Sequence, residues 1–217
     1  MSHILKYIIF AEQSFNMNTK DIILKKTFNL LLINGFDAVS ISDIQKETGL
    51  SRGLLYHYFK NKEDLFIQVT EKYFIKIFDY NLRKTEGYTV YEFMNHLSKR
   101  FRKIAKSVAD ILSEMNSPAN VSLLNYHFLF YQVMQRDTIF RNKYSSTVGK
   151  ERISWEYALK NSIIRGELRK DINITESANE LYTLTDGVWF QSLFSHDGKT
   201  IVKQLESTLL HYIGLLK

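Results

Sequence analysis

The sequence predicts an all-α protein, and three observations support this fold class. The 217 residues include one proline, nine glycines and no cysteine, so few residues would interrupt a helix. Hydrophobic residues recur at spacings of three and four, which is the period of a helix with one buried face. No clear segment alternates between apolar and polar residues as a half-buried strand does. A chain of this length can bury a sizeable core, in one domain or in a small domain attached to a larger one.

The first sixteen residues, MSHILKYIIFAEQSFN, are expected to form a disordered arm. Their apolar patch is too short for a membrane span and lacks a clear cleavage site, so a secretory signal is the weaker interpretation. Met17 stands directly before a helix start, which leaves open that residues 1–16 lie upstream of the native start. Without cysteine or a long apolar stretch, the chain is expected to be cytoplasmic, with no membrane contact.

Two amphipathic helices are predicted after this arm. Thr19 can cap the first helix, Gly35 can end it, and its apolar residues share one face: Leu24, Phe28, Leu31 and Leu32. Ser40 precedes the second helix, with Asp43 three residues later as in a capping box, and Gly49 closes it after about two turns.

A third helix begins after Ser51 and completes the pattern of a helix-turn-helix. Leu55 and Phe59 are four residues apart and face inward, so the intervening side chains point elsewhere: Arg52, Gly53, Tyr56 and His57. Glycine is a poor helix former, and it suits a backbone that approaches another surface closely. The predicted DNA-binding domain spans residues 17–64.

Longer helices are predicted in a larger helical domain over residues 65–217. The periodicity indicates the following helices, the first beginning just before this boundary: 62–84, 89–114, 120–135, 138–168, 174–195 and 199–216. Pro118 and its polar neighbours are expected to break the chain between two of them, and SHDGK at 195–199 is expected to form a loop.

The formal charge of +6 permits binding to a polyanion without locating a site. Most of the excess falls within residues 65–106, where the cluster KRFRKIAK at 99–106 is interpreted as a solvated helix face rather than a second nucleic-acid site.

The string VSISDIQKETGLSRGLLYHYFKNKEDL at 39–65, preceded by NGF at 34–36, resembles the TetR family of bacterial transcriptional regulators. Tyr56, Phe59 and Lys62 fit the family pattern Y-x-x-F-x-x-K, which is more specific than a generic helix-turn-helix. Gln45 and Thr48 stand where the family usually has alanine, so the second helix is expected to pack slightly differently on the third.

The resemblance implies eight DNA-contacting residues: Ser40, Ser42, Arg52, Gly53, Tyr56, His57, Tyr58 and Lys62. The forked guanidinium of Arg52 suits guanine in the major groove, although it could equally bind a phosphate. Tyr56 and Tyr58 can donate their hydroxyls to phosphates, with purely structural roles as the alternative. Lys62 begins the next helix, where its ammonium and the helix N-terminus together favour a phosphate.

Two further assignments follow from the matched positions. Ser40 is expected to cap the second helix and also to meet a phosphate, while Ser42 faces the groove. A histidine beside a tyrosine could suggest acid–base catalysis, but the position of His57 matches a DNA-facing residue of the family.

By the same resemblance, the larger domain is expected to bind a small-molecule effector and to form a homodimer. Most of its aromatic residues should be core, and four that combine an apolar body with a polar group are weak pocket candidates: His127, Tyr131, Trp155 and Trp189. The helices near 150–168 and 174–195 are expected to supply the dimer interface.

The predicted function is therefore a homodimeric regulator, typically a repressor, that binds a double-stranded DNA operator and is released by a small-molecule effector. An α-helical enzyme is disfavoured, since the chain lacks HExxH, P-loop and G-x-G-x-x-G motifs and a cysteine nucleophile. Its six histidines lack metal-ligand spacing, so neither a metal nor a cofactor is expected. A DNA-binding adaptor or structural protein without a ligand remains the third possibility.

Overall fold

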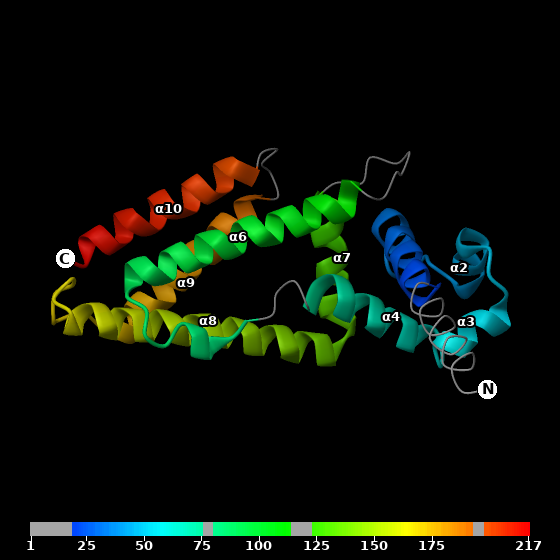
Figure 1. The fold of residues 1–217 in the computed structure, drawn as a ribbon, viewed down its shortest axis with the longest axis horizontal. Helices are drawn as coiled ribbons and strands as arrows, with labels where there is room; N and C mark the ends of the chain where they lie inside the picture. Colours follow the sequence, from blue (N-terminus) through cyan, green and yellow to red (C-terminus); the bar gives the residue numbers. More distant parts are fainter. Residues whose placement is uncertain (1–18, 76–79, 114–122, 193–197) are drawn as a thin grey trace, which may run out of the picture.

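The structure, a computed structural model, describes residues 19–75, 80–113, 123–192 and 198–217. Helices and turns make up these segments, and they contain no strand. Figure 1 shows an elongated molecule, with a small group of helices at one end and a bundle of long helices at the other. The all-α prediction is confirmed; the predicted arm at 1–16 lies outside the described residues.

The small group of helices, which we call the head, consists of a first helix over 19–34, α2 (Ile41–Thr48) and α3 (Arg52–Tyr58). Gly35 and Gly49 have φ values of 80° and 72°, a left-handed conformation that ends each of the first two helices at the predicted residue. The predicted Ser40–Asp43 capping box is present at the start of α2.

Thr48 stands where the family usually has alanine, and its hydroxyl is accommodated on α2 by local hydrogen bonds. Its Oγ1 donates to the Ile44 carbonyl at 2.7 Å and accepts from the Leu50 amide at 3.3 Å. The side chain is therefore satisfied within its own turn and takes no partner from α3.

The helix that leaves the head is shorter than the sequence predicts. Its described part comprises α4 (Lys62–Thr70) and a π-helical turn, η1 (Glu71–Ile75); residues 76–79 lie outside the described residues, and the chain is not helical at Tyr80. Tyr80 is buried, and its hydroxyl donates to Ser154 Oγ at 2.7 Å. The prediction of one helix over 62–84 is thus wrong, because a long-range contact of Tyr80 outweighs the helical periodicity; a 3₁₀ turn, η2 (Leu82–Lys84), follows.

Five long helices among the described residues form the larger part, which we call the body: α6 (Val90–Ser113), α7 (Leu123–Arg136), α8 (Thr138–Ile164), α9 (Ile174–Gln191) and α10 (Gly198–Leu215). These helices confirm the predicted order, with small shifts at the ends. The predicted helix over 138–168 stops at Ile164, because Gly166 is left-handed, with φ of 73°. Pro118 and most of the predicted 195–199 loop lie outside the described residues.

Two hydrophobic clusters hold the molecule together. One lies within the body and packs α6, α8, α9 and α10 against one another. The other contains the buried faces of the head helices and α4 together with residues of α7 and α8, among them Tyr126, Leu129 and Phe140. Phe28 of the first helix stacks on Tyr73, with ring centroids 4.1 Å apart. Core packing therefore crosses the predicted domain boundary at residues 64–65.

Helix α7 also holds the end of the first helix by polar contacts. Asn125 Nδ2 donates to the Leu32 carbonyl at 3.2 Å, and Gln132 Oε1 accepts from the Phe36 amide at 3.0 Å. Arg136 forms an ion pair with Asp37. These contacts, with the shared cluster, fix the head against one helix of the body.

Candidate nucleic-acid interface

Helix α3 divides into a buried and an exposed side. Leu55 and Phe59 are each 2% exposed and anchor the helix in the shared cluster. Arg52, Gly53, Tyr56 and His57 are exposed, as their spacing predicts. Figure 1 places α3 at the end of the molecule opposite the body, and the exposed side of this helix carries a cation, two ring side chains and a glycine.

Gly53 is not required by the packing of the protein itself. A Cβ atom added at this position would meet no heavy atom within 4 Å. The glycine costs α3 some stability and relieves no internal clash, and it leaves the backbone of α3 open to close approach by an outside surface.

The ring side chains of α3 have two different environments. Arg52 lies over the ring of Tyr56, 5.6 Å from its centroid, so both remain at the surface and support each other. Tyr58 is half-buried, packs against the shared cluster, and meets His57 edge to face at 5.2 Å. Tyr58 therefore has a structural contact that Tyr56 lacks.

Ser40 is the N-cap of α2 and Ser42 lies in its first turn, and the two serines have different surroundings. Asp43 Oδ2 accepts two hydrogen bonds from Ser40, one from its hydroxyl at 2.6 Å and one from its amide at 2.8 Å. These two bonds lower the pKa of the Asp43 carboxyl. A DNA phosphate at Ser40 would compete with the Asp43 carboxylate for the hydroxyl and the amide of Ser40. Ser42 is exposed in the first turn of α2.

Lys62 stands at the first turn of α4, as predicted, but it is only partly exposed. Its Nζ lies 5.0 Å from the centre of the Phe66 ring. Asn61 caps the helix by accepting the Asp64 amide at 2.7 Å, and Asp64 accepts the Lys60 amide at 2.8 Å. This reciprocal capping explains the Asn-Lys-Glu-Asp sequence that follows α3.

The sequence did not single out Lys20 and Lys60. Both are close enough to Asp64 to help lower the pKa of its carboxyl, although hydrogen bonds from Gln68 and the Lys60 amide are the larger causes. Lys20, at the start of the first helix, also lies over the Phe59 ring at 5.7 Å. Tertiary structure thus brings Lys20 to the turn between α3 and α4, where Lys60 already lies by its place in the sequence, and no local spacing predicts that meeting.

The four residues predicted for an effector pocket do not converge. Trp189 lines a cavity in the body, and buried His127 lies beside it, with ring centroids 5.4 Å apart. Trp155 is 0% exposed inside the body cluster, against Phe93, and Tyr131 is 54% exposed on α7. Only Trp189 lines this cavity.

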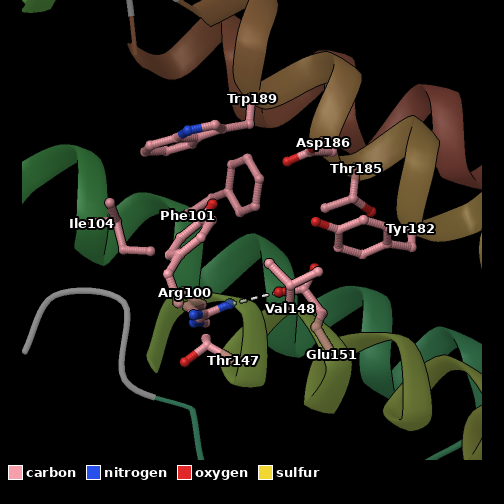
Figure 2. A pocket seen from close by; sticks show the side chains of 11 residues that line it. Arg100, Phe101, Ile104, Thr147, Val148, Glu151, Tyr182, Thr185, Asp186 and Trp189 are labelled. Atoms are coloured by element: carbon pink, nitrogen blue, oxygen red, sulfur yellow. Dashed lines mark hydrogen bonds and ion pairs between the residues drawn. The ribbon is translucent and has the colours of Figure 1, made fainter. Parts of the chain in front are cut away.

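The cavity lies between α6, α8 and α9 and measures about 50 Å³ (Figure 2). Its lining combines aromatic rings with charged groups from all three helices: Arg100, Phe101, Ile104, Tyr144, Thr147, Val148, Glu151, Tyr182, Thr185, Asp186 and Trp189. Arg100 Nη1 donates to Glu151 Oε2 at 2.8 Å, and both side chains are largely buried.

Both carboxyl groups of this cavity resist ionisation. Burial raises the pKa of Glu151, against the opposing effect of Arg100, and burial alone raises the pKa of Asp186. Burial and then the charge of Asp186 raise the pKa values of Tyr144 and Tyr182. The cavity therefore has a negative potential once both carboxyls are ionised.

We expect Asp186→Asn to raise the melting temperature more at pH 7.5 than at pH 4.5. The folded-state pKa of Asp186 lies above the unfolded value near 3.8, so the carboxyl costs stability progressively as pH rises through the folded pKa. The effect should be small, because Asp186 is exposed at the cavity rim. An equal or larger advantage at pH 4.5 would contradict the raised pKa.

Within the described ranges, no group of three or more histidine, aspartate or glutamate side chains is placed to hold a metal ion. A search of the same residues finds no helix with the length and hydropathy needed to span a membrane.

The head matches a known family of regulators. The family model described as bacterial regulatory proteins, tetR family, matches residues 23–69. The chain is 42% identical over 53 residues to the HTH-type transcriptional regulator QacR of Staphylococcus aureus, covering 24% of this chain and 28% of that protein. It is 24% identical over 106 residues to the biofilm operon icaADBC HTH-type negative transcriptional regulator IcaR of Staphylococcus epidermidis, covering 45% of this chain and 57% of that protein.

The fold of the whole chain has counterparts as well. A TetR transcription regulator from Haloarcula marismortui superposes with a TM-score of 0.59 at 15% identity, over 92% of this chain and 98% of that one. The chain spans less than two thirds of the length of the curated relatives that it matches. Residues 23–69 thus match the helix-turn-helix of the TetR family of bacterial regulatory proteins, and the chain as a whole has the fold of a solved TetR regulator.

Proposed function

We propose that the protein is a cytoplasmic, homodimeric transcriptional regulator that binds an operator in double-stranded DNA, represses from it, and leaves it when a small molecule binds the body. The observation that carries the proposal is the exposed side of α3, where Arg52, Tyr56 and His57 surround a glycine that internal packing does not require. A recognition helix needs such a surface, because its side chains must reach base edges while its backbone lies close to the DNA.

The cations and helix N-termini around α3 are suited to binding the phosphates of DNA. Lys62 stands at the N-terminus of α4, with Lys60 exposed just before it. Phosphate contacts fix the orientation of a protein on DNA, and base contacts choose the sequence. In this proposal Arg52 reads bases, while Lys62, Tyr56 and the start of α2 at Ser40 and Ser42 hold the backbone.

Exposed apolar side chains support a dimer built on α9 and α10. Phe190 is 51% exposed on α9, and Leu210 is 46% exposed on α10. Of the two regions expected from the sequence to pair, 174–195 includes Phe190. The other, 150–168, belongs mostly to α8, which is packed against α6 and α9; its exposed apolar residue is Ile164 at the helix end. We therefore assign the dimer interface to α9 and α10.

Selection of DNA from random oligonucleotides by the purified protein tests this function, combined with light scattering at micromolar concentration. We expect a dimer and a near-palindromic site whose halves are centred about 34 Å apart, or a multiple of that distance, since two recognition helices related by a two-fold axis enter successive major grooves. A monomer, or selected DNA without a shared sequence, would contradict the proposal.

A further inference from the structure

The cavity between α6, α8 and α9 is walled by aromatic rings. Phe101, Tyr144, Tyr182 and Trp189 line it, and the rings of Phe101 and Trp189 meet at 89° with centroids 5.4 Å apart. Figure 2 shows the Asp186 carboxylate and the Tyr182 hydroxyl directed toward the same space, next to Phe101. The faces of aromatic rings attract cations and offer nothing comparable to anions.

The lining of this cavity has one more carboxylate than it has cations. Arg100 is engaged on two sides, by Glu151 at 2.8 Å and by the Tyr80 ring at 5.0 Å from its guanidinium carbon. Arg100 and Glu151 therefore neutralise each other. Asp186 has no such partner: among the described residues, no cation lies close enough to lower its pKa appreciably.

We propose that the effector is an organic cation, whose positive group occupies this cavity between Asp186 and the rings of Phe101, Tyr182 and Trp189. The inference rests on the proposed function and specifies the chemical class of its effector. A bound cation would supply the charge that Asp186 lacks and would be surrounded by ring faces in a partly desolvated space, where cation–π attraction is strongest.

The size of the cavity fits a small positive group rather than a whole effector. About 50 Å³ corresponds to a few water molecules, which suits an alkylammonium group. A larger cavity of about 440 Å³ adjoins it, because Tyr144 and Thr147 line both. Phe74, Ile75 and Phe140 line this second cavity, and they suit the apolar part of the same molecule.

The charges of the larger cavity argue against a second positive group. Lys143 and Lys150 are part of its lining, and Lys143 pairs with Glu71 at 2.6 Å. A dication that filled both cavities would bring its second charge close to Lys150. The expected effector therefore carries one positive charge at one end of an otherwise uncharged body.

An anionic effector would need a different arrangement of the same residues. It would have to replace Glu151 as the partner of Arg100, and Glu151 is only 8% exposed. That exchange would leave a buried carboxylate without its counter-charge, which is strongly unfavourable. The Arg100–Glu151 ion pair therefore disfavours the binding of an anionic effector in this cavity.

Calorimetric titration of the full chain with three small aromatic probes tests the proposal: benzyltrimethylammonium, benzyl alcohol and benzoate. We expect the cation to bind at least about tenfold more tightly than either of the others, since they share the ring and differ in charge. Equal or tighter binding of benzyl alcohol or benzoate, or no binding of the cation at millimolar concentration, would overturn the inference.

Two variants on α9 locate the site. Asp186→Asn should weaken binding of the cation about tenfold or more, while Glu176→Gln, which removes another α9 carboxylate from the exposed first turn, should leave it unchanged. Equal losses in both variants would show that the cation responds only to the overall charge of the protein, and no loss in Asp186→Asn would place it elsewhere. Either result would overturn the assignment.

Operator binding, measured separately on the same preparations, distinguishes failure of this inference from failure of the proposed function. A protein that selects a palindromic sequence but ignores benzyltrimethylammonium remains a regulator with a different effector. If it binds the cation at Asp186 without selecting DNA, the cavity is assigned correctly and the proposed function fails.

Discussion

Arg52→Ala is expected to weaken binding to the preferred operator roughly five- to 150-fold and to leave binding to unrelated DNA almost unchanged. This range corresponds to the roughly 1–3 kcal/mol that a good side-chain contact to a base contributes. Arg52 is exposed at the start of α3 and contacts the Tyr56 ring without an acidic partner among its described contacts, so its truncation should not disturb the head. Binding measured on the selected operator and on scrambled DNA gives the ratio directly.

Lys62→Ala should have a different effect, which separates base contacts from phosphate contacts. It should weaken binding to all sequences about equally and reduce the slope of log affinity against log salt by about 1. Lys170→Ala removes the same charge from the turn between α8 and α9, far from the head, and should alter neither quantity (Figure 1). A changed sequence preference in Lys62→Ala, or an unchanged one in Arg52→Ala, would show that the assigned roles are wrong.

Trp155→Ala is expected to destabilise the protein by about 3–5 kcal/mol, the usual cost of removing a large buried ring. Trp155 is fully buried in the body cluster and meets Phe93 edge to face, with centroids 4.7 Å apart. Its loss would leave a cavity among α6, α8, α9 and α10, whose packing holds the body together. Chemical denaturation, with the midpoint and slope compared with those of the unchanged protein, measures this loss.

Trp155→Phe is the matched variant, and it should cost much less. Among the described residues, the Trp155 Nε1 atom is buried with no hydrogen-bond partner, so removing it relieves an unmet donor and partly offsets the lost volume. If Trp155→Ala instead kept full stability and lost only its response to an effector, the residue would act in a pocket rather than in the core.

Local signals in the sequence predicted much of the head. Three of its features depend on residues only a few positions apart: the Ser40–Asp43 capping box, the left-handed Gly35 and Gly49, and the inward pair Leu55 and Phe59. A short sequence pattern is therefore enough to predict each of them. The exposed side of α3 follows from the same spacing.

The cavity between α6, α8 and α9 could not be predicted in the same way. Arg100, Glu151 and Asp186 come from three helices, and their meeting depends on how those helices pack. A polar group on a ring, the criterion that selected Tyr131 and Trp155, does not distinguish an exposed or core residue from one that lines a cavity. The non-helical backbone at Tyr80 could not be predicted for the same reason. The hydrogen bond from Tyr80 to Ser154 joins residues that are far apart in the sequence, so no local pattern indicates it.

The contacts of Asn125, Gln132 and Arg136 with the segment from Leu32 to Asp37 limit how freely this head could be exchanged between relatives. A chimaera that joined the head to a foreign body would lose the partner of the Phe36 amide and the counter-charge of Asp37, and Phe28 would lose the edge-to-face contact with Tyr126. The transplantable unit is therefore the head together with α4 and the matching face of α7, a set of residues that is discontinuous along the chain.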